Sequence, residues 1–284
     1  MTYIDERPKP CLALMGEFSA GKSTLANLLI GSDPLPVQVV ATQLPPVCIS
    51  YGSAPAYAAD LEGNETPVDV NDLSGIDLNT VSYLQIYCEE DILLQCDLLD
   101  MPGISDPNMS SEVWERLIDR ADGVLWCSHA TQAWRQSEAA VWSDMPSELY
   151  SRSLLLLTRI DKLTTQSDKD RVLKRVTKET EGLFADVLPI SLLLATQEQD
   201  DYDAWAQSGA EAFATRLIAL LASLNAEVVG QQAPGAEDGL RLPGLEAPVS
   251  STHSAALPTR PSRAPRVVPR RIQADAPRTI RPDS

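Results

Sequence analysis

One short stretch of the sequence carries residue types suited to holding a phosphate group. Residues 16–24 fit the pattern G-x-x-x-x-G-K-[ST]. The glycines would let backbone N–H groups curl around a di- or triphosphate, while Lys22 reaches the outer phosphates and the Ser23 hydroxyl binds Mg²⁺. We call residues 16–24 the phosphate loop and expect it to bind a nucleotide through Gly16, Glu17, Phe18, Ser19, Ala20, Gly21, Lys22, Ser23 and Thr24.

A second motif could complete the metal side of such a site. Asp100 and Gly103 form a D-x-x-G pattern after an apolar run at residues 92–99, which we expect to be a strand. Asp100 would hold the Mg²⁺ shell from the side opposite Ser23. The Gly103 N–H could bond the γ-phosphate, so that hydrolysis would release the loop.

A third motif indicates which base the nucleotide carries. Residues 158–161, Thr158-Arg159-Ile160-Asp161, follow four leucines and resemble the guanine-reading [NT]-K-x-D motif of GTPases. The Asp161 carboxylate can accept hydrogen bonds from the ring N–H and the exocyclic amine of guanine, whereas adenine lacks this donor pair. Arg159 stands where lysine is usual, and its stem can still cover the base. Because Asp161 suits guanine, GTP is favoured over ATP. Ser191 is expected in the last base-side loop.

These motifs need strands and helices to position them, and the apolar periodicity of the sequence predicts both. The predicted strands are residues 11–15, 46–51, 81–88, 92–99, 123–128, 153–158 and 186–190. The predicted helices are residues 22–30, 111–121, 134–144, 168–183 and 209–225. Their alternation predicts an α/β fold with a doubly wound, mostly parallel sheet. Residues 52–80 hold six acidic residues and no basic one, and are predicted to form an exposed insertion.

The composition divides the 284 residues into two parts. We predict a globular domain at residues 1–229 and a disordered tail, rich in proline and arginine, at residues 230–284. The formal net charge is −17, although residues 231–284 hold eight arginines against five acidic residues. The domain surface is therefore a poor match for nucleic acid or an anionic membrane. The tail is either a spacer or an arm that docks on an acidic protein or an anionic membrane.

Cysteine usage and hydropathy indicate the compartment. The five cysteines are scattered, without a C-x-x-C pair or a histidine cluster, which predicts free thiols in a reducing environment. The sequence shows no signal-peptide pattern and no apolar stretch near 18 residues. We therefore expect a cytoplasmic protein whose contact with a membrane, if any, is peripheral.

Residues 16–29 and 35–46 together resemble the phosphate loop and first switch of dynamin-like GTPases, particularly the bacterial ones. The resemblance covers roughly residues 9–228 and implies that Thr42 is the switch threonine, a Mg²⁺ ligand that helps to place the attacking water. An ordinary strand residue is the alternative for Thr42. The resemblance also implies that Ser19 holds a monovalent cation and that two G domains meet across their nucleotide faces. The helical stalk of the family has no expected counterpart here.

The motifs and the resemblance together predict a Mg²⁺-dependent P-loop GTPase that binds GTP and GDP. Lys22, Thr42 and Ser19 are the expected catalytic residues, and Ser23, Thr42 and Asp100 the expected metal ligands. The nucleotide state would control association of the chain with itself or with a partner protein. The alternative is an adaptor that binds GTP, barely hydrolyses it and acts through the arginine-rich tail. Phe18 and Ile104 favour the adaptor, because neither side chain can orient a water molecule.

Overall fold

A mixed β-sheet runs through the computed structural model, which describes residues 9–31, 45–70, 72, 80–105, 117–198 and 200–232. The strands are β1 (Cys11–Gly16), β2 (Val47–Tyr51), β3 (Tyr57–Asp60), β4 (Glu65–Pro67), β5 (Val81–Cys88), β6 (Asp97–Asp100), β7 (Gly123–His129), β8 (Ser153–Thr158) and β9 (Asp186–Pro189). The α-helices are α1 (Lys22–Ile30), α4 (Gln136–Ser143), α5 (Gln166–Glu179), α6 (Leu192–Gln197), α7 (Tyr202–Gln207) and α8 (Ala210–Gln232). Short 3₁₀ turns are η1 (Asp91–Leu94), η2 (Ala130–Gln132), η3 (Ser147–Arg152) and η4 (Ile160–Lys162).

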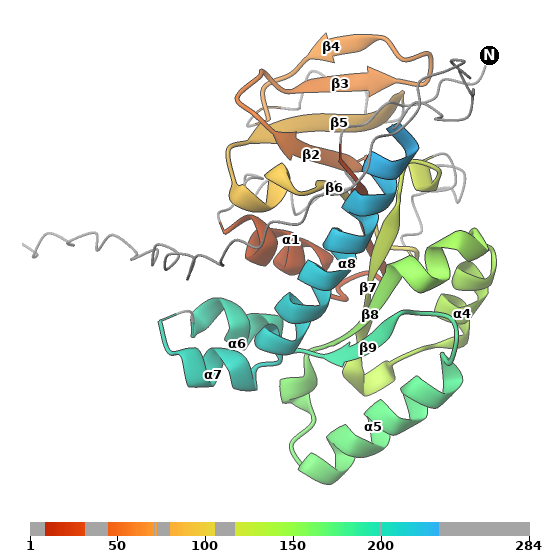
Figure 1. The fold of residues 1–284 in the computed structure, drawn as a ribbon, viewed down its shortest axis with the longest axis vertical. Helices are drawn as coiled ribbons and strands as arrows, with labels where there is room; N and C mark the ends of the chain where they lie inside the picture. The colour runs from red at the N-terminus through yellow and green to blue at the C-terminus, as the bar shows by residue number, and fades with distance from the viewer. Residues whose placement is uncertain are drawn as a thin grey trace, which may run out of the picture. The chain divides into compact units, whose positions relative to one another are not determined.

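The strand order is β4-β3-β5-β2-β6-β1-β7-β8-β9, with β1 near the middle (Figure 1). Strands β6, β1, β7, β8 and β9 are mutually parallel, and β2 is parallel to β5. The pairs β2–β6, β3–β5 and β3–β4 are antiparallel. The predicted α/β fold with a mostly parallel sheet is therefore confirmed, and the carboxyl ends of β1, β7 and β8 meet at one edge.

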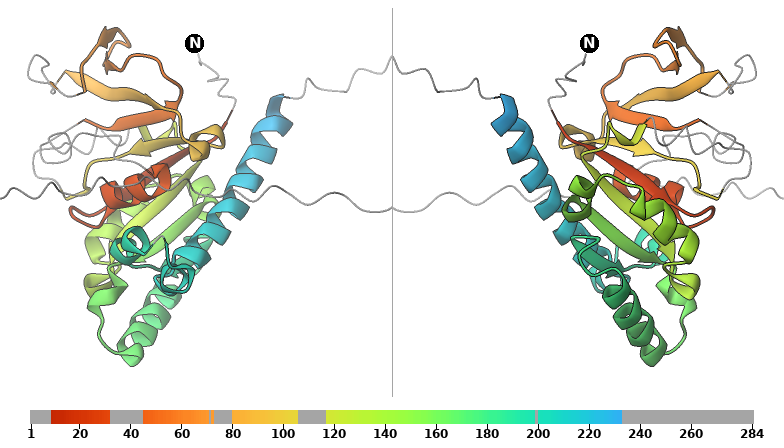
Figure 2. Two further views of the ribbon diagram at one scale, coloured as in Figure 1. Left: turned by 90° about the vertical axis from the view of Figure 1, so that its left-hand side faces the viewer. Right: turned by 90° about the vertical axis from the view of Figure 1, so that its right-hand side faces the viewer.

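Alternate residues of the central strands face opposite sides of the sheet, as the strand geometry requires. In β1, Leu12 and Leu14 pack in one buried cluster with α1, α6 and α8, whereas Ala13 and Met15 pack in the other with α4 and α5. Both faces are thus covered by helices, which explains why these strands read as continuous apolar runs. Figure 2 shows the long α8 lying along one side of the sheet.

The structure corrects two of the predicted elements. Residues 92–99 were predicted as one strand, but η1 precedes a shorter β6, because Leu93 turns into the core while Leu94 points to solvent. Residues 52–80, predicted as an exposed insertion, contribute β3 and β4 to the sheet. Ala58 and Ala59 of β3 are buried. Of the acidic residues that motivated the prediction, Asp60 lies in β3, Glu62 in the turn after it and Glu65 in β4.

The last helix is longer than predicted. Helix α8 runs to Gln232, so the predicted tail boundary at residue 230 falls inside it. Residues 233–284 and most of the predicted helix 111–121 lie outside the described residues. Among the helices that the structure describes, none combines the length and hydropathy of a membrane span.

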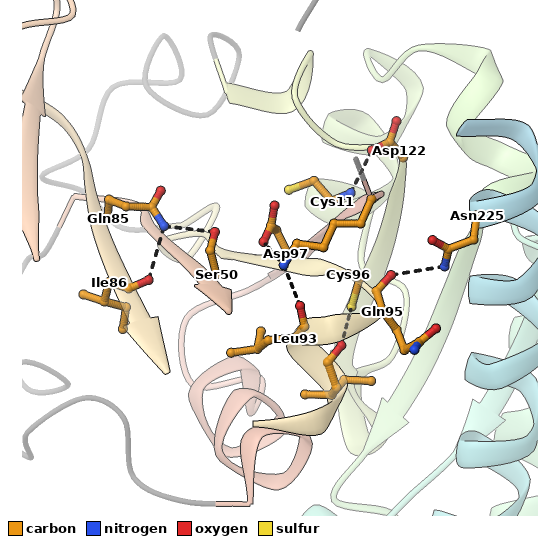
Figure 3. A network of polar contacts seen from close by, with 12 residues as sticks. Cys11, Ser50, Gln85, Ile86, Leu93, Gln95, Cys96, Asp97, Asp122 and Asn225 are labelled. Carbon is orange, nitrogen blue, oxygen red and sulfur yellow. Dashed lines mark hydrogen bonds and ion pairs between the residues drawn. The ribbon is translucent and has the colours of Figure 1, made fainter. Parts of the chain in front are cut away.

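Polar contacts fasten the end of β1 that lies away from the phosphate loop (Figure 3). The Cys11 N–H donates to Asp122 Oδ2 at 2.7 Å, just before β7 begins. Asn225 Nδ2 of α8 donates to the Gln95 carbonyl oxygen at 3.1 Å, between η1 and β6. These contacts hold β1 and α8 to the neighbouring strands, so β1 enters the phosphate loop from a fixed position.

A buried carboxylate organises the connection from β7 to α4. Glu138 is 1% exposed and accepts hydrogen bonds from Trp126 Nε1 at 3.0 Å, Ser128 Oγ at 3.0 Å and the Arg135 N–H at 2.9 Å. Ser128 Oγ in turn accepts from the N–H of Trp134, whose φ of +57° lies in the left-handed region. A non-glycine residue keeps this φ only where its surroundings determine it, so the connection is rigidly built.

Candidate functional site

The phosphate loop joins β1 to α1, and its conformation depends on two glycines. Gly16 has φ +138°, and a Cβ there would lie 2.0 Å from the Cys127 carbonyl oxygen of β7. Gly21 has φ +99° and supplies no side-chain hydrogen bond to the start of α1. Because the first N–H groups of a helix have no partner within the helix, an anion is the ligand that the start of α1 favours. Ser19 also takes a left-handed φ, +58°.

The ammonium group of Lys22 lies against this loop. Lys22 is 8% exposed, and Nζ donates to the carbonyl oxygens of Gly16 at 3.2 Å and Glu17 at 2.9 Å. Both acceptors have a second donor, since Ile104 N–H reaches Gly16 and Ala20 N–H reaches Glu17, each at 3.2 Å. The positive charge is thus held beside the loop, where a phosphate would need it.

The D-x-x-G segment packs directly on the phosphate loop. A Cβ on Gly103 would lie 2.9 Å from both Cα and N of Phe18, so only glycine fits this approach. Asp100 is paired with Leu14 of β1, two residues before Gly16. Burial raises the pKa of Asp100 to about 6, and the charge of Lys22 acts in the opposite direction.

Two of the three expected metal ligands are described. Asp100 ends β6 and Ser23 lies in the first turn of α1, at the same edge of the sheet. A carboxylate and a hydroxyl are hard oxygen donors, which suit Mg²⁺. The residues therefore fit the ion. Thr42 lies outside the described residues, as do residues 35–44 of the expected first switch at residues 35–46.

The base-reading motif is tied to the phosphate loop by two hydrogen bonds. Thr158 Oγ1 donates to the Ala20 carbonyl oxygen at 2.7 Å, and Arg159 Nη2 donates to the Ser19 carbonyl oxygen at 2.8 Å. Arg159 therefore extends along the loop with φ +55°. The guanidinium can do this in place of lysine because it also carries N–H donors at the end of an aliphatic stem.

Asp161 meets Ser191 on the same side of the site. Ser191 Oγ donates to Asp161 Oδ1 at 2.6 Å, across 30 residues of sequence. Ser191 also begins α6, accepting from the Leu194 N–H at 3.4 Å. The hydroxyl thus fixes one oxygen of the carboxylate, and Lys162 Nζ lies 3.8 Å from the other, Oδ2.

The structure also brings residues to the site that sequence reasoning missed. Ser105 follows the D-x-x-G motif, and Arg135 and Ser137 lie at the start of α4. Together with Glu17 we call these residues the rim cluster: Glu17, Ser105, Arg135 and Ser137. A glutamate three residues into a helix is a capping signal and could have located the start of α4, but nothing in the pattern indicated a contact with residue 17.

Within the described residues, two predicted site residues, Phe18 and Thr24, form no side-chain hydrogen bond with the other motifs. Phe18 is 70% exposed, and its contribution to the loop is its backbone. Thr24 is exposed in the first turn of α1. Sequence reasoning assigned both to nucleotide binding only as members of the loop, so these assignments remain predictions for their backbone groups.

A change at Asp100 is expected to separate metal binding from stability. The pKa of Asp100 is raised above the 3.8 of an ordinary carboxyl, so its contribution to folding is complete below about pH 4 and is lost as the pH rises through 6. Without nucleotide, Asp100→Asn should therefore exceed wild type in stability by about 1 to 2 kcal/mol at pH 8 and by less at pH 5. Its Mg²⁺-dependent affinity for GTP should fall. Thermal melts at both pH values measure the difference, and parallel curves would contradict the cause given for the shift.

Comparisons with known proteins agree with this geometry. The sequence model of the dynamin family matches residues 12–160. "Dynamin-like protein 2" of Campylobacter jejuni subsp. jejuni serotype O:23/36 (strain 81-176) is 25% identical over 194 residues, which are 66% of this chain and 32% of that protein. The chain thus spans about one third of its curated relative.

Solved structures with the same fold include two chains from an oligomerised bacterial dynamin pair. One superposes with a TM-score of 0.57 at 19% identity, over 78% of this chain and 48% of that chain. The other gives a TM-score of 0.58 at 18% identity, over 79% of this chain and 37% of that chain. The described domain therefore shares its fold with part of each of these longer chains.

Proposed function

Because the chain belongs to the dynamin family, we propose that it binds GTP with Mg²⁺ and hydrolyses it to GDP and phosphate. The observation that carries this proposal is the joining of the phosphate loop to the base-reading motif through Thr158 and Arg159. A loop for phosphates and a carboxylate for guanine are thereby held at one edge of the sheet. The phosphate loop and Asp161 are about 140 residues apart in the sequence, so we interpret their placement at one edge as a binding site rather than as a result of packing alone.

Each residue of the proposed site has a role that follows from its chemistry. Lys22 and the first N–H groups of α1 offset the negative charge on the β- and γ-phosphates, and Asp161 selects guanine. Ser23, Asp100 and Thr42 would hold Mg²⁺, which supplies further positive charge beside the phosphates when bound. Thr42 would also place the attacking water, and Ser19 a monovalent cation, as the family resemblance implies.

We further propose that the nucleotide state governs association of the chain with itself or a partner in the cytoplasm, with peripheral contact to a membrane. "Sensing and tethering of membranes" is what the solved bacterial dynamin pair is described as doing. For this chain, the arginines of residues 231–284 are the proposed arm for an acidic protein or anionic lipid. The predicted boundary at residue 230 is moved to the end of α8, so we treat the chain up to Gln232 as the G domain and residues 233–284 as that arm.

A second function, that of a GTP-dependent adaptor, is favoured by one observation. Phe18 is apolar and 70% exposed at the loop, and Ile104 follows Gly103, so neither side chain can hydrogen-bond a water. Water placement then depends on Thr42 and on a second chain. An adaptor would bind GTP with the same residues and hydrolyse it only very slowly.

The two functions differ in how turnover depends on protein concentration. If G domains pair across their nucleotide faces and order the first switch, phosphate release per molecule should rise several-fold between about 0.1 and 10 μM protein, because pairing follows mass action. Multiple-turnover phosphate release at saturating GTP measures this. A flat and very slow rate, with GTP bound throughout, would support the adaptor; absence of GTP binding would reject both functions.

A further inference from the structure

The side chain of Glu17 does not face the phosphate side of its own loop. Ser137 Oγ, in the first turn of α4, donates to Glu17 Oε1 at 2.6 Å across 120 residues of sequence. The described hydrogen bond between Lys22 and Glu17 uses the backbone carbonyl oxygen of Glu17 and not its carboxylate. The carboxylate is therefore used at the outer rim of the site, toward α4.

The residues on either side of Glu17 hold the end of the D-x-x-G segment. Ser105 Oγ accepts from the Phe18 N–H at 3.3 Å. The Ile104 N–H donates to the Gly16 carbonyl oxygen at 3.2 Å, so residues 103–105 lie along the phosphate loop. Burial alone would raise the pKa of Glu17, but Ser105, Ser137, Arg135 and Lys22 together hold it below its usual value. The carboxylate is thus ionised at neutral pH.

The two serines differ in how firmly they are held. Ser137 adjoins Glu138, the buried carboxylate that fixes the start of α4. Arg175 of α5 also donates to the Ala133 carbonyl oxygen at 2.9 Å, which secures the connection before α4. Ser105 instead is exposed, at the end of the described segment. Glu17 therefore joins this fixed support to the part of the phosphate loop, Gly16 and Phe18, that holds the exposed segment.

We infer that Glu17 is a positioning residue that anchors the Gly103–Ser105 segment to α4, so that the Gly103 N–H stands ready for a γ-phosphate. This inference rests on the proposed function. Without Glu17, GTP would have to order the segment when it binds, and this cost would weaken GTP binding. GDP lacks the γ-phosphate, so its binding does not require the segment to be ordered. The expected effect is a fall of about fivefold in the ratio of GTP-analogue to GDP affinity, typical of one lost charged hydrogen bond at a partly exposed site.

The test is calorimetric titration of the full chain with GDP and with a non-hydrolysable GTP analogue, both with Mg²⁺. The variants are Glu17→Ala, Ser137→Ala and the double change, with Ser143→Ala as the matched control at the other end of α4, where its hydroxyl bonds only the Ala140 carbonyl oxygen in the described structure. Because both single variants remove one contact, the double variant should fall no further than Glu17→Ala. Glu17→Gln keeps an acceptor oxygen and should lie between wild type and Glu17→Ala.

The outcomes separate the inference from the proposed function. A lower affinity ratio in Glu17→Ala and Ser137→Ala, non-additive in the double variant, supports the inference. Equal losses of affinity for both nucleotides, or affinity ratios equal to that of wild type, overturn the inference. Neither result contradicts the proposal that the chain binds GTP. If wild type binds neither nucleotide, the proposed function fails first. Ser137→Ala lies on an exposed helix turn, so it remains a valid test even if Glu17→Ala does not fold.

Discussion

Lys22→Ala is expected to lower the affinity for GTP by roughly 30- to 1000-fold, the equivalent of about 2 to 4 kcal/mol. Lys22 is the cation that the phosphate loop itself supplies, and Nζ already lies within 3.2 Å of two loop carbonyl oxygens. The ammonium group is therefore already in position before GTP binds, and the substitution removes a charge that needs no further ordering. Titration with a fluorescent GTP analogue in the presence of Mg²⁺ measures the loss.

The fold should tolerate this change. The carbonyl oxygens of Gly16 and Glu17 keep their bonds from Ile104 and Ala20, so no described acceptor there is left bare. Lys174→Ala, on the exposed surface of α5, removes the same charge far along the chain and is the matched control. A Lys22→Ala protein that melts normally and binds GTP as tightly as wild type would contradict the assignment of the phosphate loop.

Asp161→Asn is expected to shift the preference of the site from guanine to xanthine nucleotides, with a loss of GTP affinity of roughly 10³-fold. Guanine presents two donors to the Asp161 carboxylate, whereas xanthine replaces the exocyclic amine with a carbonyl group. The asparagine oxygen can keep the bond that Ser191 Oγ makes to Oδ1, which directs the amide N–H₂ toward the base. Competition between GTP, XTP and ATP for the wild type and the variant measures the shift.

Two comparisons make this test specific. Asp170→Asn on the exposed face of α5 removes one negative charge without touching the site, and should leave base preference unchanged. Ser191→Ala should weaken GTP binding without favouring XTP, because the carboxylate keeps its chemistry and loses only its support. Wild-type protein that binds ATP as well as GTP would refute the interpretation of residues 158–161.

The sequence was sufficient for the parts of the site in which the residue type is dictated by backbone geometry or by direct chemistry. Gly16 and Gly103 admit no side chain because backbone of another segment lies too close, and Gly21 has a φ of +99° that favours glycine, so the patterns that contain them predict real backbone constraints. Thr158 and Ser191 were predicted from motif position alone, and the structure places Thr158 against Ala20 of the phosphate loop and Ser191 against Asp161.

The rest depended on contacts that local patterns do not encode. The bond between Glu17 and Ser137 joins residues that only the folded sheet brings together. β3 and β4 escaped notice because small alanines and acidic residues carry a weak strand signal, and pairing with β5 decided their conformation. An apolar run cannot distinguish a buried turn from a buried strand, which is why η1 was predicted as part of β6.

The two outer strands of the described sheet limit how a second chain could join it. β4 and β9 are three and four residues long, and each begins with a carboxylate and ends with a proline. Proline offers no N–H, and a charged side chain at an edge repels strand addition, so neither border is a template for continuing the sheet into a neighbour. A second copy of this domain would then bind through loops and helices, whose surface a bound nucleotide can alter. Such association would be reversible, because it does not extend the sheet into a fibre.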